Sequence, residues 1–346
     1  MARSVHLVGG IPGSTAREAM EAALSRLAPH LRTLSDGETG ARSWWIRASL
    51  DRLRDHPDLD LIRDGDYSSY EKTPQWRVKE GRELTAESLE PYLVMAEAFR
   101  SSYPLFRDLR EAYGRPDLAF QVGIPLHLDL AVDAFGEAGF APAIYEPCLE
   151  ATARQVRSIH ADSQGDVVFQ LEMPVPLIAI AGAPQEGQPG TASEMAKRIT
   201  DLPQRADAGT RFGVHLCLGD MNHKALGRMR DVRPLVLLAN DLVRRWPADR
   251  PLEYIHAPFA AAEEPPTFDD AFYSPLRDLD LPPEIRFIAG CVHERLSLDE
   301  ERRLLSMIEQ LAGRQVDLAA ACGLARRPDV SQAWDAMDKS AALVDA

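Results

Sequence analysis

A histidine and a cysteine stand two positions apart near the end of an apolar run, in Gly213-Val214-His215-Leu216-Cys217-Leu218-Gly219-Asp220. The run reads as a buried strand, and side chains at positions i and i+2 of a strand point to the same face. The imidazole of His215 and the thiol of Cys217 are therefore expected to project together. Imidazole nitrogen and thiolate sulfur are ligands that Zn²⁺ prefers. Cys322, near the other end of the chain, adds a third candidate, so these residues predict a zinc site, with buried packing as the alternative.

Polar residues also stand at the ends of the other apolar runs that we predict as strands: Glu38, Glu172, His256, Cys291 and His293. Parallel barrels assemble their active sites at the C-terminal ends of their strands, so these side chains are expected near the zinc ligands. A carboxylate on an apolar strand is costly to bury without a partner, which favours a functional role for Glu172. For Glu38, which follows a glycine, turn chemistry is the alternative. Cys291 is expected to be a small core residue, and Asp220 to cap the helix that follows it.

Short apolar runs alternate with longer amphipathic stretches along the chain. The runs predicted as strands are 5–10, 33–38, 118–125, 167–174, 211–218, 252–257, 285–293 and 316–322. The stretches predicted as helices are 16–27, 86–112, 141–160, 224–245, 297–312 and 330–344, with loops at 182–191 and 260–266. The spacing in Ser297-Leu298-Asp299-Glu300 predicts a capping box. Eight strands that alternate with helices predict a single (β/α)8 barrel over residues 1–346.

The long polar stretch 51–81 is predicted to be an insertion after the second strand. Insertions at the C-terminal side of barrel strands commonly form lids over a site, so this segment is expected to be lid-like. Aromatic residues within and just before it are expected to pack against the protein rather than to stack on a ligand: Tyr67, Tyr70, Trp76, Trp44 and Trp45.

Composition and charge exclude several classes of protein. Hydrophobic residues make up 45% and charged residues 27% of the 346 residues, as in a soluble globular protein with a large core. The net charge of −14 argues against a nucleic-acid-binding protein, which needs a basic face. The 4 cysteines are too few and too scattered for a disulfide framework. No apolar signal region begins the chain and no run approaches membrane-spanning length, so we predict a cytoplasmic protein without a membrane partner.

Several phrases of the chain resemble the catalytic barrel of cobalamin-independent methionine synthase, in the same order and over most of the length. Val8-Gly9-Gly10-Ile11-Pro12 looks like that family's first-strand Ile-Gly-Ser-Phe-Pro, and Asp36-Gly37-Glu38 resembles its His-Gly-Glu. Gln170-Leu171-Glu172-Met173-Pro174 parallels its Gln-Ile-Asp-Glu-Pro, and His215-Leu216-Cys217 matches its metal-binding His-x-Cys. Val292-His293 falls at its Ile-His, and Cys322-Gly323-Leu324-Ala325-Arg326-Arg327 is close to its Cys-Gly-Leu-Lys-Thr-Arg. The resemblance implies the barrel type that methionine synthases and uroporphyrinogen decarboxylases share.

The resemblance also implies a set of roles. In that family one zinc ion is held by the histidine, the two cysteines and a sixth-strand glutamate, and it binds homocysteine as a thiolate that attacks the methyl group of a folate. By resemblance the zinc ligands here are His215, Cys217 and Cys322. The residues implied at the substrate are Gly10, Glu38 and Glu172, the two carboxylates binding an amino group. His293 falls at the place of the proton-donating histidine.

Departures from the family pattern bear on the substrate. His256 replaces the sixth-strand glutamate and is expected to be the fourth ligand, which leaves the site without net formal charge and makes the zinc a stronger Lewis acid. The alternatives are that His256 contacts another ligand or the substrate, and that water or the substrate thiol fills the fourth position. Gly10 stands where the family has serine, and Glu172 where it has aspartate, so the thiol need not be homocysteine. The chain also lacks the synthase's N-terminal barrel and is more similar to short single-barrel relatives, some of which take methyl groups from corrinoid proteins.

We therefore expect a zinc-dependent alkyl- or methyltransferase that activates a small thiol for attack on an alkyl donor, with a folate or a corrinoid protein as possible donors. A zinc-dependent lyase or hydrolase acting on a C–S bond is the alternative from another reaction class. A barrel that binds zinc or a thiol without turnover is the third hypothesis.

Overall fold

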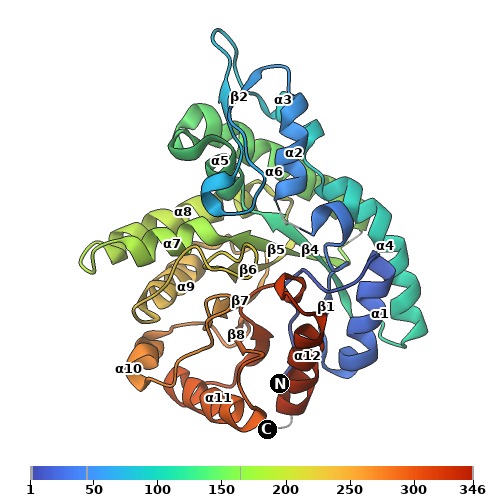
Figure 1. The fold of residues 1–346 in the computed structure, drawn as a ribbon, viewed down its shortest axis with the longest axis vertical. Helices are drawn as coiled ribbons and strands as arrows, with labels where there is room; N and C mark the ends of the chain where they lie inside the picture. The colour runs from blue at the N-terminus through green and yellow to red at the C-terminus, as the bar shows by residue number, and fades with distance from the viewer. Residues whose placement is uncertain (1–2, 44–45, 164, 345–346) are drawn as a thin grey trace.

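A seven-stranded parallel sheet forms the centre of the molecule (Figure 1). The structure is a computed structural model that describes residues 3–43, 46–163 and 165–344. Trp44 and Trp45, predicted to be packing residues, lie outside the described residues. Along the sheet the strands follow the order β1 (Thr33–Leu34), β4 (Ala119–Pro125), β5 (Val167–Met173), β6 (Arg211–Leu216), β7 (Leu252–Pro258), β8 (Arg286–Val292) and β9 (Asp317–Ala320). Because neighbouring strands pair in parallel, their C-terminal ends lie at one end of the sheet.

Helices cover the sheet from outside and bury its strands. The longer helices are α1 (Ala16–Leu27), α4 (Met95–Ala112), α6 (Pro142–Ser163), α8 (Gln188–Arg205), α9 (Arg233–Arg245), α11 (Leu298–Ala312) and α12 (Val330–Val344). Shorter ones are α2 (Arg47–Arg52), α3 (Ala86–Leu89), α5 (His127–Phe135), α7 (Pro174–Gly182) and α10 (Asp270–Tyr273). Every residue of β5 and β9 is buried, as is usual for parallel strands covered on both faces.

The N-terminal segment differs from the predicted first strand at 5–10. Val5 makes single parallel bridges to Leu31, just before β1, and to Leu318 in β9, and no strand is assigned around it. Val5 N donates to His30 O at 2.9 Å, and His6 N to Leu318 O at 2.7 Å. Since one residue bridges both edges, the seven-stranded sheet is strongly curled. Its ladder holds seven of the eight predicted strands among the described residues.

Most helices lie where the sequence predicts them, and the differences have local causes. Helices α1 and α12 match their predicted bounds, and the capping box at Ser297 and Glu300 is confirmed. The helix predicted at 86–112 is divided into α3 and α4, because Pro91 begins a separate turn. The helix predicted from residue 224 begins only at α9, where Pro234 stands in the first turn. The loop predicted at 182–191 ends early, because α8 begins at Gln188.

The predicted insertion forms an antiparallel hairpin of β2 (Leu59–Arg63) and β3 (Gln75–Val78) that projects at the top of Figure 1. Strand β3 packs against α5, and the buried ring of Trp76 confirms its predicted packing role. The Tyr70 hydroxyl accepts from Met221 N at 2.9 Å and donates to Lys224 O at 3.0 Å. Asn222 Nδ2 donates to two carbonyls of the insertion at 3.3 Å each. The inserted segment is therefore tied to the loop that follows β6.

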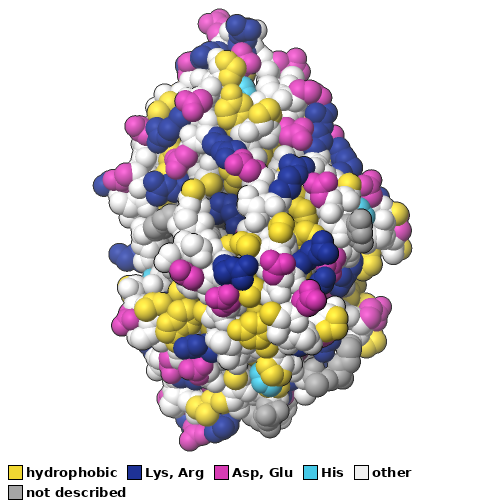
Figure 2. All heavy atoms as spheres, turned by 90° about the vertical axis from the view of Figure 1, so that its right-hand side faces the viewer, with side chains coloured by type: hydrophobic (Ala, Val, Ile, Leu, Met, Phe, Trp, Pro, Cys, Tyr) yellow, Lys and Arg dark blue, Asp and Glu magenta, His cyan; other side chains and the backbone are white. Residues whose placement is uncertain are grey.

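Acidic and basic side chains are interspersed on the face of the molecule in Figure 2, with small apolar areas between them. Among the described residues no helix combines the length and apolar character needed to cross a membrane.

Candidate metal centre

Three strands bring the candidate residues into one row. Glu172 on β5 lies directly opposite His215 on β6, and His215 lies opposite His256 on β7. Side chains of paired residues in neighbouring strands point to the same face, so this register sets a carboxyl group and two imidazoles next to one another. All three side chains are buried. Because each residue lies in the last part of its strand, the row stands at the C-terminal end of the sheet.

Cys217 and Cys322 join His215 to form the group of residues that could hold a metal ion. One ligand atom from each lies within 4.8 Å of the others, and no other group of three or more such residues occurs in the described part of the chain. Tetrahedral zinc, with bonds of about 2.0–2.3 Å, requires ligand atoms roughly 3.6–3.8 Å apart. One imidazole and two thiols therefore suit zinc in their chemistry, and their ligand atoms would need to move only slightly closer together to bind it. The convergence joins a segment after β6 with one after β9, more than 100 residues further along the chain.

The two sulfur atoms interact directly. A hydrogen bond from the Cys217 thiol to the Cys322 sulfur raises the pKa of Cys217 and lowers that of Cys322, while the charge of Asp220 raises both. Gly219 N also donates to Cys217 Sγ at 3.3 Å. Cys322 is therefore the more acidic of the two thiols.

His256 lies behind His215 and has both ring nitrogens engaged. Its Nε2 lies 3.0 Å from Ala320 O, and its Nδ1 lies 2.8 Å from His215 Nδ1. Burial lowers the pKa of His256 to about 4 and that of His215 well below its usual value, so both rings are neutral. A carbonyl only accepts, so His256 Nε2 donates its proton there and His256 Nδ1 accepts from His215 Nδ1. His215 Nε2 is then the nitrogen left for a metal, and His256 is not a member of the ligand group.

Two buried carboxyl groups, Glu38 and Glu172, converge beside the ligand group. A Cβ placed on Gly123 would lie 2.9 Å from Glu38 Oε1 and 2.6 Å from Glu172 Oε1, so only glycine fits between these oxygens and β4. Burial raises the pKa of both groups, and the charge of Glu38 raises that of Glu172 further, while Arg326 lowers both. Gln170 Nε2 donates to Glu172 Oε1 at 2.8 Å. Two carboxyl groups this close together in a buried environment are stabilised by a shared proton or by a bound cation.

Glu38 is held in a backbone conformation that is unusual for a residue with a side chain. Its φ of 50° lies in the left-handed region, which is unfavourable by about 1 kcal/mol or more outside glycine. Asp36 Oδ1 accepts from Glu38 N at 3.0 Å, and Ser102 Oγ donates to Asp36 Oδ2 at 2.7 Å. The turn therefore directs the Glu38 carboxyl group inward at a cost in backbone energy, beyond the simple turn chemistry considered above.

A cavity of about 390 Å³ opens over these groups. Its floor contains most of the candidate residues: Gly10, Glu38, Glu172, His215, Cys217 and Cys322. Its walls are mainly apolar and come from α2, the insertion, α5 and the loop after β6: Leu50, Tyr67, Tyr70, Val132, Met221 and Leu226. An apolar cavity of this size with a few convergent polar groups is typical of a small-molecule site.

His293 is not among the described residues that line this cavity. Its Nδ1 accepts from Arg295 N at 3.2 Å, and its Nε2 lies 3.1 Å from Ala262 O. Burial lowers the pKa of His293, so the neutral ring donates to the carbonyl and holds the loop after β8. Cys291 is buried in β8 and is not part of the ligand group, as expected for a core residue.

Sequence reasoning missed a buried ionic chain beside the ligand group. His223 Nδ1 lies 3.9 Å from Asp220 Oδ2, and His223 Nε2 lies 3.0 Å from Glu294 Oε1. The two carboxylates raise the pKa of His223 to about 9. Arg327 Nε lies 3.3 Å from Glu294 Oε2 and completes the chain. The prediction that Asp220 caps the next helix is wrong, because α9 begins at Arg233.

Asp133 on α5 is a further cavity carboxyl group that the sequence did not single out. Burial raises its pKa to about 7. Because the pKa of this carboxyl group is higher in the folded than in the unfolded protein, the group stabilises the fold fully at pH values below its unfolded pKa near 4. This contribution is lost as the pH rises through the folded pKa of about 7.

We therefore expect the free energy of unfolding of Asp133→Asn, relative to that of wild type, to be higher at pH 8 than at pH 5 by at least about 1 kcal/mol. This magnitude follows from roughly 1.4 kcal/mol for each unit of pKa shift. Urea unfolding at the two pH values measures this difference. The exposed Asp338→Asn is the control, and an equal pH response in both variants would contradict the assignment.

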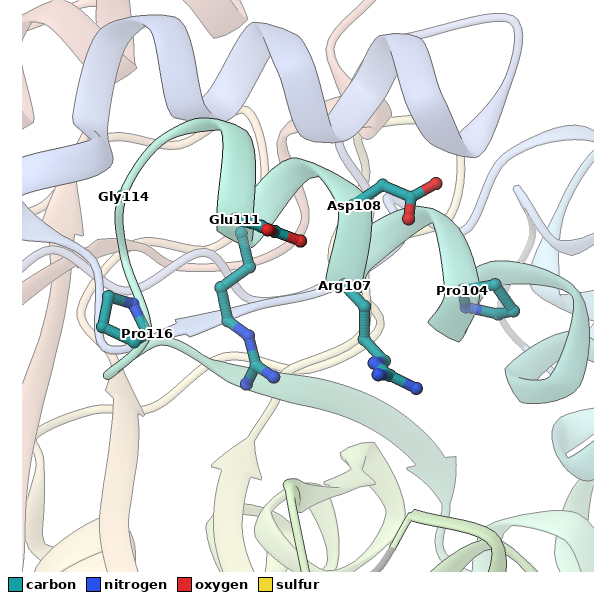
Figure 3. Close-up of a pocket in the computed structure, with 7 residues that line it drawn as sticks. Pro104, Arg107, Asp108, Glu111, Gly114 and Pro116 are labelled. Atoms are coloured by element: carbon teal, nitrogen blue, oxygen red, sulfur yellow. The ribbon is translucent and has the colours of Figure 1, made fainter.

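Another hollow, of about 560 Å³, runs along the second half of α4 (Figure 3). It is lined by Pro104, Arg107, Asp108, Arg110, Glu111, Gly114 and Pro116. None of these residues stands at the C-terminal end of a strand, and none belongs to the ligand group. The candidate residues therefore gather in the cavity over the ligand group and not in this hollow.

Comparison with known proteins agrees with this architecture. No protein-family model and no curated protein sequence matches the chain. A solved structure of a proposed vitamin-B12 independent methionine synthase from Listeria monocytogenes is similar with a TM-score of 0.53 and 13% identity, over 95% of this chain and 85% of that chain. A methyltransferase from Methanosarcina mazei is similar with a TM-score of 0.53 and 14% identity, over 99% and 94%. At these identities the likeness shows the fold alone, an α/β architecture with the curled parallel sheet of these proteins.

Proposed function

We propose that this protein is a zinc-dependent enzyme that transfers an alkyl or methyl group to a small thiol with an amino group. The observation that carries the proposal is the convergence of His215, Cys217 and Cys322 on the floor of a cavity that also holds Glu38 and Glu172. Two thiols and an imidazole are donors for zinc, and a pair of buried carboxylates is a site for an ammonium group. Gly10 lines the same cavity beside Glu38, where an added Cβ would lie 3.7 Å from Glu38 Oε2.

The protein's own residues would divide the work in the following way. His215 Nε2, Cys217 Sγ and Cys322 Sγ would hold the zinc. A zinc ion bound there lowers the pKa of a thiol that reaches it, so that the thiol becomes a nucleophile at neutral pH. Glu38 and Glu172 would bind the substrate's ammonium group and fix the position of its sulfur. The apolar walls would exclude water from the sulfur and accept the alkyl donor.

His256 is proposed to orient His215 rather than to bind the metal, since both of its ring nitrogens are engaged. Partners of a histidine ligand typically contribute 10- to 100-fold to metal affinity. We therefore expect His256→Gln to weaken zinc binding by about that factor without changing the number of sulfur and nitrogen neighbours of the metal. Chelator competition and X-ray absorption on the variant measure the two quantities. Loss of one nitrogen neighbour would instead support the sequence prediction of His256 as the fourth ligand.

Two finer features of the architecture belong to the same proposal. The segment around Val5 would complete a (β/α)8 barrel over residues 1–346 by closing the gap between β1 and β9. The insertion at 51–81 would act as a lid, because Tyr67 and Tyr70 line the cavity and the segment is tied to the loop after β6. A lid that opens would admit either a folate-like donor or a corrinoid on a partner protein.

Alkyl transfer is tested by product analysis. Purified zinc-loaded protein is incubated with homocysteine in three mixtures: with a methylated folate, with methylcobalamin, and without a donor. Products are identified by mass spectrometry. Formation of methionine with a donor, and not without one, is the expected result. Turnover of thiols or thioethers in the absence of any donor would indicate the lyase or hydrolase alternative. Tight zinc binding without any product would leave a non-catalytic binding protein.

A further inference from the structure

The carboxylate of Asp220 has no hydrogen-bond partner although it is almost completely buried. Its side chain is 2% exposed, and neither Oδ1 nor Oδ2 has a hydrogen-bond partner. Leaving a buried carboxylate without a strong partner is unfavourable by several kcal/mol. His223 Nδ1, at 3.9 Å from Oδ2, also has no hydrogen-bond partner and compensates part of this charge. The second oxygen, Oδ1, has no hydrogen-bond partner, so this atom is available to a ligand.

Asp220 lies in a short segment that is fixed on both sides next to the ligand group. Gly219 N donates to Cys217 Sγ at 3.3 Å, and Met221 N donates to the Tyr70 hydroxyl at 2.9 Å. Asp220 also lines the cavity together with Cys217 and Cys322, close enough for its charge to act on both sulfurs. The backbone therefore presents this carboxylate to the side of the cavity that holds the two thiols.

The ionic chain behind Asp220 resembles the support that protein metal ligands usually have. Carboxylates that bind metals are commonly hydrogen-bonded through their second oxygen, which fixes their orientation. Here His223 stands behind Oδ2, Glu294 holds His223 at 3.0 Å, and Arg327 holds Glu294 at 3.3 Å. These residues come from the loops after β6, β8 and β9, so the chain fixes Asp220 relative to both cysteines.

We propose that Asp220 is the fourth protein ligand of the metal, an inference that rests on the proposed function. Three ligands leave one tetrahedral position, and His256 is committed to His215 and Ala320. No oxygen of Asp220 belongs to the group of atoms within 4.8 Å, so its side chain would have to turn toward the sulfurs to reach a metal held there. Asp220 would hold the metal in the absence of substrate and would give up this position to the substrate thiol. A carboxylate ligand is the weakest donor of this set for zinc, which suits a position that must be opened to the substrate.

The test compares metal binding by Asp220→Asn with that by wild type and by Asp133→Asn. The Asp133 variant is the matched control, because it makes the same change in another cavity carboxyl group on α5. Zinc affinity is measured by chelator competition, and Co²⁺-substituted protein is examined by visible spectroscopy and X-ray absorption. We expect Asp220→Asn to bind zinc at least about 100-fold more weakly and to lose one oxygen neighbour, and Glu294→Gln to bind it about 10-fold more weakly. Asp133→Asn is expected to bind zinc as wild type does.

A measurement without metal separates this role from a structural one. Because the carboxylate is only partly compensated by His223 without the ion, metal-free Asp220→Asn is expected to unfold at the same temperature as metal-free wild type or above it. Zinc should raise the unfolding temperature of wild type more than that of the variant. Equal zinc affinity and an unchanged cobalt spectrum in Asp220→Asn would overturn the inference while leaving the zinc site intact. Failure of wild type to bind zinc at all would instead overturn the proposed function.

Discussion

Cys322→Ser is expected to lose stoichiometric zinc on purification, with an affinity at least about 100-fold below that of wild type. A serine hydroxyl is not ionised at neutral pH and is a far weaker ligand for zinc than a thiolate. Cys217→Ser should behave in the same way, because both sulfurs belong to one group with His215. The measurement is metal content of the purified proteins, followed by chelator competition. Serine at either position should not change the fold, since the two side chains lie at the cavity floor after their strands.

Cys291→Ser provides the matched control for this experiment. Cys291 is a buried cysteine at the end of β8, the strand next to β9, and it is not part of the ligand group. Its replacement should leave zinc content unchanged even if it lowers stability. Wild-type zinc content in all three serine variants would contradict a metal centre at His215, Cys217 and Cys322.

Glu172→Gln is expected to lower kcat/KM for an amine-bearing thiol by about 10- to 100-fold, the range that corresponds to one lost charge-assisted hydrogen bond of roughly 1.5–3 kcal/mol. The loss should be specific for the amino group. We therefore expect wild type to prefer homocysteine over 4-mercaptobutanoate, which lacks that group, and the variant to distinguish the two much less. Glu38→Gln should show the same pattern, because the two carboxyl groups lie against the same glycine, Gly123. Initial rates with both thiols measure the effect.

Glu137→Gln is the control for charge, since Glu137 is an exposed carboxylate at the rim of the same cavity. It should keep the preference of wild type for homocysteine. An equal loss with both thiols in Glu172→Gln would contradict the role in binding the amino group. Such a result would assign the buried pair to stability of the floor instead.

The periodic parts of the fold could be predicted from the sequence because burial alone determines them. Strand β5 is buried at every position, and its mainly apolar sequence predicts a strand. Helix α1 is predicted by the helical spacing of its apolar residues. The approach of Cys322 to His215 and Cys217 was also predicted. That prediction depended on the rule that parallel strands end at one side of a sheet and on the order of the family phrases.

The remaining features depend on directions of side chains that spacing does not encode. His256 was expected beside the cysteines, yet its ring lies between His215 and Ala320 O because neighbouring strands set these groups in register. The ionic chain from Asp220 to Arg327 joins three loops, and no local pattern relates residues so far apart. The predicted first strand at 5–10 is a similar case, since its apolar run predicts a ladder and Val5 makes only single bridges, to Leu31 and Leu318.

The bridges of Val5 set an order of events during synthesis. One partner, Leu318, lies in β9, and the adjacent Arg3 donates to Leu343 O at 2.8 Å near the end of the chain. A chain that emerges from the ribosome N-terminus first must therefore keep the segment around Val5 unpaired on one side until Leu318 has been translated. Cys322 is translated shortly after Leu318, so His215, Cys217 and Cys322 can converge only at the same late stage. A product that is truncated before residue 322 would therefore lack one of the three side chains of the ligand group.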